Sequence, residues 1–462
     1  MGAEAKGYEV MVKSMETVVA VLPVQEHRLP QSNFDLLLPP IDVGVFFCFR
    51  KPTPVADGDV DSVGPTTFPA MVANLKAALA KVLVTYYPLA GEVVTNSAGE
   101  PEIHCNNRGV DFTEAYADVD LRDLNLYDPD DSVEAKLVPK KKDGILSIQV
   151  TELSCGAVVV GCMFDHRVAD AYSFNMFMSA WAETALGQPV SSMPSLRRSL
   201  LSSRPLLPSN PLDPLLDRFF TPLSLCPPPN PNISFSAPVN RIYYVSATDV
   251  ARLQEIAGRK HSKLVCFTAF LWQILAKSAN LGEKSCSMGI VVDGRSRMKN
   301  VHGKKFMESY FGNVLSIPYG NLRVETLLDM KLGEVAQEVY DWLSPAATED
   351  HFLGLLDWVE AHRPEPAAAR IYLGDSNEED KSVSCVVSSG RGFPEINFGW
   401  GSAVFGSYHF PWGGKAGYLM PIPRKSGDWV VYAHVAPSIV SVMEEEPTIF
   451  HQLTKEYFLG SV

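Results

Sequence analysis

The sequence predicts an α/β protein with mixed (α+β) sheets, arranged as two comparable domains. The first observation is length, because 462 residues exceed what one hydrophobic core organises and suit two domains of about 200 residues each. The second is that strand and helix patterns alternate in both halves of the chain, which is typical of α/β folds. The third is a single proline-rich stretch near the middle, where we expect a linker.

In the first half, β-branched and aromatic runs bounded by proline or glycine predict strands, and three- and four-residue spacing of apolar residues predicts helices. We expect strands at 17–24, 43–49, 146–153 and 156–164, and helices from 68 to a stop at Pro88 and at about 169–186. The run at 156–164 is nearly all apolar, so it is expected to be central in its sheet.

The second half repeats this alternation. We expect strands at 241–246, 287–296, 382–390, 417–423 and 429–436, and helices at about 247–259, from 262 onward, 325–342 and 349–361. The proline-rich stretch between the halves predicts no regular structure. The predicted division is an N-terminal domain of residues 1–195, a crossover linker of residues 196–240, and a C-terminal domain of residues 241–462.

Composition excludes several classes of protein. The net charge of −13 leaves no surplus of lysine and arginine for phosphate contacts, which argues against a nucleic-acid partner. Eight scattered cysteines without a CxxC pair fit buried thiols in a reducing compartment better than a disulfide framework or a zinc site. Because no apolar run is long and uncharged enough to span a bilayer, we expect a cytoplasmic protein without membrane contact.

One short stretch contains the candidate chemistry. FDHRVADAYSF (164–174) places His166 and Asp170 four residues apart, where an apolar strand gives way to a helix. On spacing alone, His166 is either a satisfied or exposed histidine at a helix start, or a general base at a strand end that faces a crevice. Asp165 would raise the pKa of the imidazole if its carboxylate lies close. Metal binding and a serine nucleophile lack their usual patterns, since neither HExxH nor GxSxG occurs.

Further motifs give this stretch a context. INFGWGSAVF (396–405) contains a glycine-rich signature, and YYPLAGEV (86–93), VVDGRSRM (291–298) and YFGN (310–313) precede it. In this order they resemble the plant BAHD acyl-CoA-dependent acyltransferases, with their HxxxD and DFGWG motifs, over nearly the whole chain. The opening segment is similar to the coniferyl alcohol acyltransferase branch. The resemblance implies two chloramphenicol-acetyltransferase-like domains with an interfacial channel that acyl-CoA and acceptor enter from opposite sides.

The resemblance also implies roles for the first motif. His166 would be the general base that deprotonates the acceptor while it attacks the thioester, and would then return the proton to the CoA thiolate, without a covalent acyl-enzyme. Asp170 would point away from the substrate and pair with an arginine, so its role would be orientation. General base catalysis of this kind contributes about two to four powers of ten in rate.

In the second motif, asparagine stands where the family usually has aspartate. Asn397 can hydrogen-bond an arginine such as Arg295 or Arg297 but cannot neutralise it, so we expect the position to support the site without titrating. The glycines permit a tight backbone path, and the tryptophan between them is either a core plug or a wall of the channel. The residues expected to support the site are Asn397, Gly399, Trp400, Gly401, Arg295 and Arg297.

Two segments predict what the acceptor pocket prefers. Relatives that use shikimate or quinate carry an arginine at the place of Gly392, with Arg391 one residue off, so the resemblance disfavours a carboxylated acceptor. Val43 and Phe46 stand where those relatives have hydroxyl side chains, which favours an aromatic or apolar alcohol such as a phenylpropanoid, although both residues are alternatively strand core. Asp42 would attract an ammonium, which keeps open N-acylation of an amine such as a polyamine or aryl-alkylamine.

The donor side is less defined. Ser262 and Lys263 stand beside motifs that line the channel and are candidate CoA contacts, although such residues at helix starts are commonly only solvated. The sequence does not distinguish an acetyl from a hydroxycinnamoyl donor. We expect acyl-CoA as cosubstrate, no cofactor, no metal, and a monomer. The alternative from another class is a catalytically silent relative that binds small molecules or protein partners.

Overall fold

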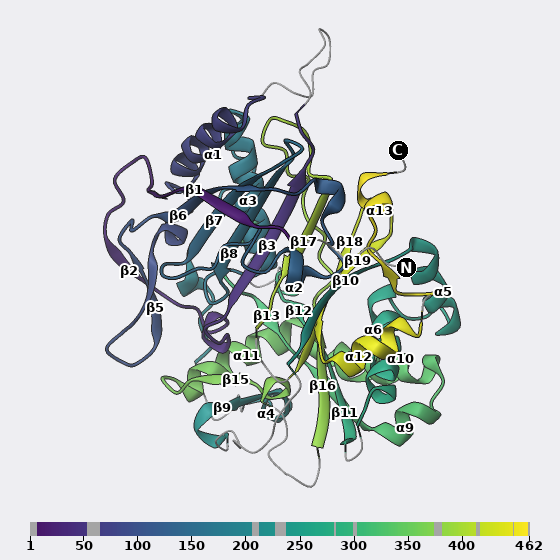
Figure 1. Ribbon diagram of the computed structural model, residues 1–462. Coiled ribbons are helices and arrows are strands. Elements are labelled where there is room, and N and C mark those ends of the chain that lie inside the picture. Colours follow the sequence, from purple (N-terminus) through teal and green to yellow (C-terminus); the bar gives the residue numbers. More distant parts are fainter. Residues whose placement is uncertain are drawn as a thin grey trace.

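The computed structural model describes residues 7–52, 65–205, 212–226, 237–280, 283–298, 303–373, 381–412, 416–446 and 448–460. Two large mixed sheets, each with helices packed against it, form the two lobes of the molecule (Figure 1). The predicted α/β class with mixed sheets is confirmed.

The first sheet contains six strands, and β8 lies inside it as its apolar sequence predicts. Two helices, α1 (Phe68–Val82) and α3 (Ala171–Ala185), pack against each other beside this sheet (Figure 1). The indole of Trp181 in α3 donates a hydrogen bond to the carbonyl of Leu75 in α1 at 3.0 Å. In spatial order the strands are β1 (Val10–Val18), β6 (Val110–Ala117), β7 (Leu146–Leu153), β8 (Val158–Asp165), β3 (Asp42–Phe49) and β17 (Phe405–His409).

The second sheet contains seven strands and has α6 as the main helix against it. In spatial order the strands are β14 (Tyr319–Arg323), β11 (Glu283–Ile290), β16 (Lys381–Val387), β18 (Gly417–Pro423), β19 (Trp429–Val435), β10 (Val239–Val245) and β20 (His451–Gln452). The helices of this lobe are α5 (Ala247–Ile256), α6 (Lys263–Lys277), α9 (Val324–Asp329), α10 (Leu332–Ala346) and α12 (Pro437–Glu444).

Shorter elements complete the fold. One small sheet joins β2 (His27–Pro30), β5 (Pro101–Cys105) and β4 (Glu92–Thr95), and two strand pairs join β12 (Val292–Asp293) to β13 (Leu315–Ser316) and β9 (Phe220–Pro222) to β15 (Ala367–Ala369). The remaining helices are α2 (Pro129–Ser132), α4 (Pro214–Phe219), α8 (Lys304–Ser309), α11 (Glu349–His362) and α13 (Lys455–Leu459). None of the helices in the described ranges has both the length and the apolar character needed to cross a membrane.

The strand β17 belongs to the second half of the sequence but to the first sheet. It pairs antiparallel with β3, with Phe405 opposite Cys48 and His409 opposite Gly44 (Figure 1). The rings of Phe398 and Trp400, just before β17, pack against Phe49 of β3. The predicted C-terminal domain of residues 241–462 therefore needs a correction, because this segment is built into the first lobe.

The predicted linker of residues 196–240 also contains regular structure. Within its described part, α4 begins at Pro214, and the side chain of Asp213 caps it by accepting a hydrogen bond from the Leu215 N–H at 2.9 Å. Proline at the first position of a helix is favourable because the N–H it lacks has no helical partner there. The expectation of no regular structure was wrong at this point, since proline starts this helix rather than breaking it.

The first strand was placed too late by the sequence pattern. A strand was predicted at 17–24, whereas β1 spans Val10–Val18 and the apolar residues after it are exposed, with Val21 at 60%. β1 is an edge strand whose outer side chains, such as Lys13, face solvent. Its apolar residues do not alternate regularly with polar ones, and Met11, Val12 and Met15 are exposed, so hydrophobic periodicity does not detect the strand.

The close pairing of β3 with β17 predicts that Gly44 tolerates no side chain. A Cβ there would lie 2.5 Å from the carbonyl oxygen of His409 and 2.9 Å from Cγ1 of Val138. We expect Gly44→Ala to lower the free energy of unfolding by about 1–3 kcal/mol, the usual cost of overpacking. Urea unfolding followed by circular dichroism measures this. Gly7→Ala is the control, because nothing lies within 4 Å of its Cβ position; equal stability of the two variants would contradict the close β3–β17 contact.

Candidate active site

A cavity of about 50 Å³ lies where the two lobes meet, and side chains of both sheets line it. From the first sheet, β3, β8 and β17 contribute, and from the second sheet β18 and the loop after β16. Its lining combines apolar side chains with charged and hydroxyl groups. The large apolar side chains are those of Val43, Phe164, Val291, Leu315 and Met420.

His166 lines this cavity at the junction of β8 and α3, where the sequence predicted a strand end. Its backbone N–H donates to the carbonyl of Ile41 at 2.9 Å, and its carbonyl accepts from the side-chain amide of Asn313 at 2.9 Å. The ring of Phe410 meets the imidazole edge to face, with centroids 6.4 Å apart. Backbone anchors on both sides and one aromatic neighbour therefore fix the position of the ring.

The imidazole of His166 is held neutral by its surroundings. Burial lowers its pKa below the ordinary value of 6.5, and the carboxylates of Asp170 and Asp165 oppose this only in part. Asp165 is engaged by its own neighbour, since Arg167 bonds its two oxygens at 3.0 and 2.6 Å. The expectation that Asp165 raises the pKa of His166 is therefore right in direction but outweighed by burial. A neutral imidazole is the form that accepts a proton.

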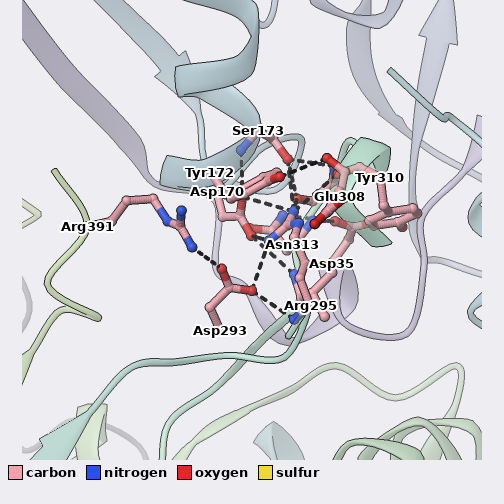
Figure 2. A network of polar contacts seen from close by, with 12 residues as sticks. Asp35, Asp170, Tyr172, Ser173, Asp293, Arg295, Glu308, Tyr310, Asn313 and Arg391 are labelled. Atoms are coloured by element: carbon pink, nitrogen blue, oxygen red, sulfur yellow. Dashed lines mark hydrogen bonds and ion pairs between the residues drawn. The ribbon is translucent and has the colours of Figure 1, made fainter. Parts of the chain in front are cut away.

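Asp170 joins the two lobes through a buried ion pair with Arg295, and Figure 2 shows the network around it. The guanidinium bonds both carboxylate oxygens, at 2.7 and 3.1 Å, while both side chains are at most 5% exposed. Asp170 also caps α3 by accepting from the Ser173 N–H at 2.9 Å, and it accepts from the Val314 N–H at 3.2 Å. Burial alone would raise the pKa of Asp170, but Arg295 and these N–H groups outweigh it and lower the pKa. Asp170 therefore stays charged and points into this network.

A second buried cluster supports the backbone around His166. Asp35 is fully buried and accepts at 2.8 Å from both the backbone and side-chain N–H groups of Asn313. It also accepts from Ser32 and from the guanidinium of Arg198 at 3.2 Å. Asn313 also bonds the His166 carbonyl. Asp35 therefore supports the backbone of His166 indirectly, by holding Asn313 in place. Neither Asp35 nor Asn313 was predicted as a site residue, although Asn313 ends the YFGN motif.

Tyr172 and Arg391 line the cavity and also two larger spaces. The ring of Tyr172 lies between two guanidinium groups, with those of Arg295 and Arg391 each 4.5 Å from its centroid. Arg391 also pairs with Asp293 at 2.6 Å (Figure 2). Both residues line a space of about 370 Å³ beside α3, the α3 hollow, and one of about 330 Å³ beside α8, the α8 hollow. The interface thus holds one small central cavity and two adjoining hollows.

Comparison with known proteins identifies the family. A family model described as the Transferase family matches residues 8–449 of the chain. The chain belongs to the BAHD acyltransferase family. The resemblance of its ordered motifs is therefore confirmed, and the protein is an acyl-CoA-dependent acyltransferase.

Similar proteins cover this BAHD acyltransferase from end to end. Putrescine hydroxycinnamoyltransferase 1 of Oryza sativa subsp. japonica is 27% identical, over 96% of this chain and 99% of its own. Shikimate O-hydroxycinnamoyltransferase of Nicotiana tabacum is 24% identical, over 97% of this chain and 100% of its own. The crystal structure of vinorine synthase has a TM-score of 0.67 at 19% identity, covering 96% of this chain and 99% of its own. That likeness supports the implied fold of two chloramphenicol-acetyltransferase-like lobes.

In this BAHD acyltransferase, Asn397 closes its own loop. Its side-chain oxygen accepts from the backbone N–H groups of Gly399 at 2.8 Å and Gly401 at 3.2 Å. Arg295 bonds Asp170 instead, and Arg297 is exposed, so Asn397 does not use the capacity to hydrogen-bond an arginine, and the support it gives is to its own loop. An amide oxygen and a carboxylate oxygen both accept from N–H groups, which explains why asparagine fits where the family has aspartate.

The residues after Asn397 have structural roles: the two glycines allow the chain to turn, and the tryptophan between them packs in the core. Gly399 and Gly401 have φ angles of 108° and 104°, the left-handed region that favours glycine. Trp400 is 5% exposed and packs between the rings of Phe49 and Phe398, with centroids 6.1 and 5.6 Å away. Of the two alternatives for Trp400, the structure favours the core plug.

Of the residues predicted to form the acceptor pocket, only Val43 lines the cavity. Phe46 is three residues further along the same strand, so its side chain points to the opposite face of the sheet, where it is fully buried. Asp42 pairs with Lys141 at 3.1 Å and does not line the cavity. Gly392 lines the α3 hollow. The assignments of Phe46 and Asp42 therefore need correction.

The candidate CoA contacts lie at the start of α6. The hydroxyl of Ser262 accepts from the Val265 N–H at 3.2 Å and caps this helix, and Lys263 is exposed. The start of α6 lies close to the loop that lines the cavity. A Cβ atom built on Gly390 in that loop would be 3.6 Å from a methyl carbon of Leu264, the residue after Lys263. CoA binding at Ser262 and Lys263 stays a prediction. Among the described residues, no three His, Cys, Asp or Glu side chains gather as a metal ion would require.

The buried pair predicts a large effect of Asp170→Asn. The substitution keeps the shape of the side chain but removes the carboxylate that bonds both arms of the buried Arg295 guanidinium, and leaves it only the single contact with Asp293 at 3.3 Å. We expect the free energy of unfolding to fall by about 3–5 kcal/mol, measured by guanidinium chloride denaturation. As a control, Lys13→Gln breaks an exposed pair with Glu152 and is expected to cost less than about 1 kcal/mol. Equal stability of both variants would show that the pair does not hold the lobes together.

Proposed function

We propose that this acyltransferase transfers a hydroxycinnamoyl group from CoA to the hydroxyl of an uncharged aromatic or apolar alcohol, with His166 as general base. The names of the two end-to-end relatives, both hydroxycinnamoyltransferases, support the acyl group. Their acceptors differ, an amine in one name and shikimate in the other, so the acceptor class is argued from the cavity of this chain.

The observation that carries the acceptor class is the pairing of charge at the cavity. Among the described residues that line it, Asp170 is paired with Arg295, and Arg391 is paired with Asp293. No surplus positive charge is left to hold a carboxylate, and no surplus negative charge is left to hold an ammonium. The apolar side chains that line the cavity suit the uncharged carbon beside the hydroxyl of an aromatic or apolar alcohol, whose ring would extend into an adjoining hollow.

The arrangement supports a direct transfer. The neutral imidazole of His166 takes the proton from the acceptor hydroxyl while the oxygen attacks the thioester carbonyl carbon. The tetrahedral intermediate then collapses, the C–S bond breaks, and the imidazolium gives its proton to the thiolate. The products are an ester and free CoA, and no group of the protein becomes acylated.

The buried position of His166 predicts the pH dependence of catalysis. Because burial lowers its pKa, kcat/KM should rise with pH and reach its plateau with an apparent pKa below 6.5. We expect His166→Gln to lower kcat by about 10²–10⁴ and to remove this pH dependence. Steady-state rates between pH 5 and 9 measure both, at substrate concentrations that separate kcat from KM. An unchanged profile in the variant would exclude the imidazole as base.

The paired charges predict the acceptor preference. With feruloyl-CoA or acetyl-CoA as donor, we expect coniferyl alcohol to exceed shikimate and putrescine by at least about tenfold in kcat/KM, because a site without matching polar partners rejects polar substrates. Release of free thiol and the mass of the product are the readouts. A preference for putrescine would establish N-acylation, and a preference for shikimate would contradict the apolar pocket. No thiol release with every pair would support the silent binding protein.

A further inference from the structure

Tyr408 lines the same cavity as His166 and has no role in the steps above. It stands on β17 opposite Val45 of β3, so its side chain is on the same face of the first sheet as Val43. Like His166 and Val43, it lines the central cavity. The strand that brings it there comes from the second half of the sequence, which is why no local pattern near His166 indicates it.

The hydroxyl of Tyr408 is buried and has no hydrogen-bond partner among the described residues. The side chain as a whole is 5% exposed. Buried tyrosine hydroxyls usually find a partner, because an unsatisfied one costs about 1–3 kcal/mol. A donor kept unpaired in the cavity of the candidate base is therefore expected to bond a substrate.

The protonation state suits a donor. Burial raises the pKa of Tyr408 well above its ordinary value, while the charge of Arg391 opposes this and that of Asp170 adds to it. The phenol therefore keeps its proton throughout the working range of His166. The neighbouring charged groups are already paired with one another, so they do not compete for this hydrogen.

The size of the cavity limits what the hydroxyl can bond. About 50 Å³ holds a functional group but not an acyl chain or an aromatic ring, which must extend into the adjoining hollows. A substrate group that occupies this space is within reach of both His166 and Tyr408, because both residues line it. In acyl transfer that group is the thioester carbonyl with the attacking oxygen beside it.

We propose that Tyr408 is a catalytic residue whose hydroxyl donates a hydrogen bond to the thioester carbonyl oxygen as negative charge develops there. This inference rests on the proposed reaction at His166. As the acceptor oxygen bonds to the carbonyl carbon, the C=O electron pair moves to oxygen, and Tyr408 stabilises that anion without giving up its proton. When the C–S bond breaks, the C=O bond re-forms and the hydroxyl is as before.

The test is Tyr408→Phe, which removes one hydroxyl and keeps the ring. We expect kcat to fall by about 10²–10³, the usual loss for one oxyanion donor. The KM values for acyl-CoA and acceptor should stay within about threefold, because the bond strengthens only in the transition state. The melting temperature should stay equal or rise, because an unsatisfied buried hydroxyl is removed.

Tyr457→Phe is the matched control. Its hydroxyl is also buried, but it lies on α13 near the carboxylate of Asp428, and its ring stacks on Tyr244, away from the central cavity. We expect its kcat to equal that of the unmodified enzyme. A loss of rate in both variants would mean that removing a buried hydroxyl disturbs the fold in general, and would overturn the proposal.

Other outcomes separate this inference from the proposed reaction. A Tyr408→Phe enzyme with kcat within about threefold of the unmodified one overturns the role of Tyr408 and leaves His166 untouched. A higher acceptor KM with unchanged kcat would place the hydroxyl on the acceptor instead, and also overturns it. If His166→Gln keeps full rate while Tyr408→Phe loses it, the base assignment fails and the oxyanion donor stands. The acceptor that turns over fastest is used throughout, whether alcohol or amine.

Discussion

The ion pair between Asp170 and Arg295 is the contact on which the rest of the site depends. Two buried charges cost several kcal/mol each to remove from water, and their attraction offsets this only when other hydrogen bonds are also satisfied. Here the carboxylate receives N–H groups of Ser173 and Val314, and the guanidinium donates to the Gly312 carbonyl at 2.8 Å and to the Ser173 hydroxyl at 3.0 Å. The same carboxylate caps α3, four residues after His166. His166 and Asp170 thus belong to one lobe, whereas Arg295, which holds Asp170 in place, belongs to the other.

The sequence predicted the parts of this site that local pattern determines. His166 and Asp170 lie within one motif. The strand at 146–153 was predicted from its own residues, without reference to its neighbours in the sheet. Asp35 was missed because its partner Asn313 is 278 residues away and nothing near either residue indicates the other. The sheet that receives β17 could not be predicted for the same reason. The misplacement of Phe46 was avoidable, since the two-residue period of a strand separates it from Val43.

Tyr172 and Arg391 govern how much room the substrates find. Tyr172 and Arg391 line the central cavity of about 50 Å³ and also the hollows of about 370 and 330 Å³, and Arg295 packs against the ring of Tyr172. Arg391 is held by a single carboxylate, that of Asp293, while Arg295 is held on several sides. A hydroxycinnamoyl group needs more space than the cavity offers.

The first lobe is built from both halves of the chain, because β17 from the second half completes its sheet. The first half of the chain does not contain the complete first sheet, because this sheet ends in a strand that is synthesised after most of the second sheet. Folding of the first lobe therefore cannot finish until the ribosome has passed residue 409. A chimera that joins the front half of one relative to the back half of another would exchange an edge strand of the front sheet, and with it one wall of the reaction chamber.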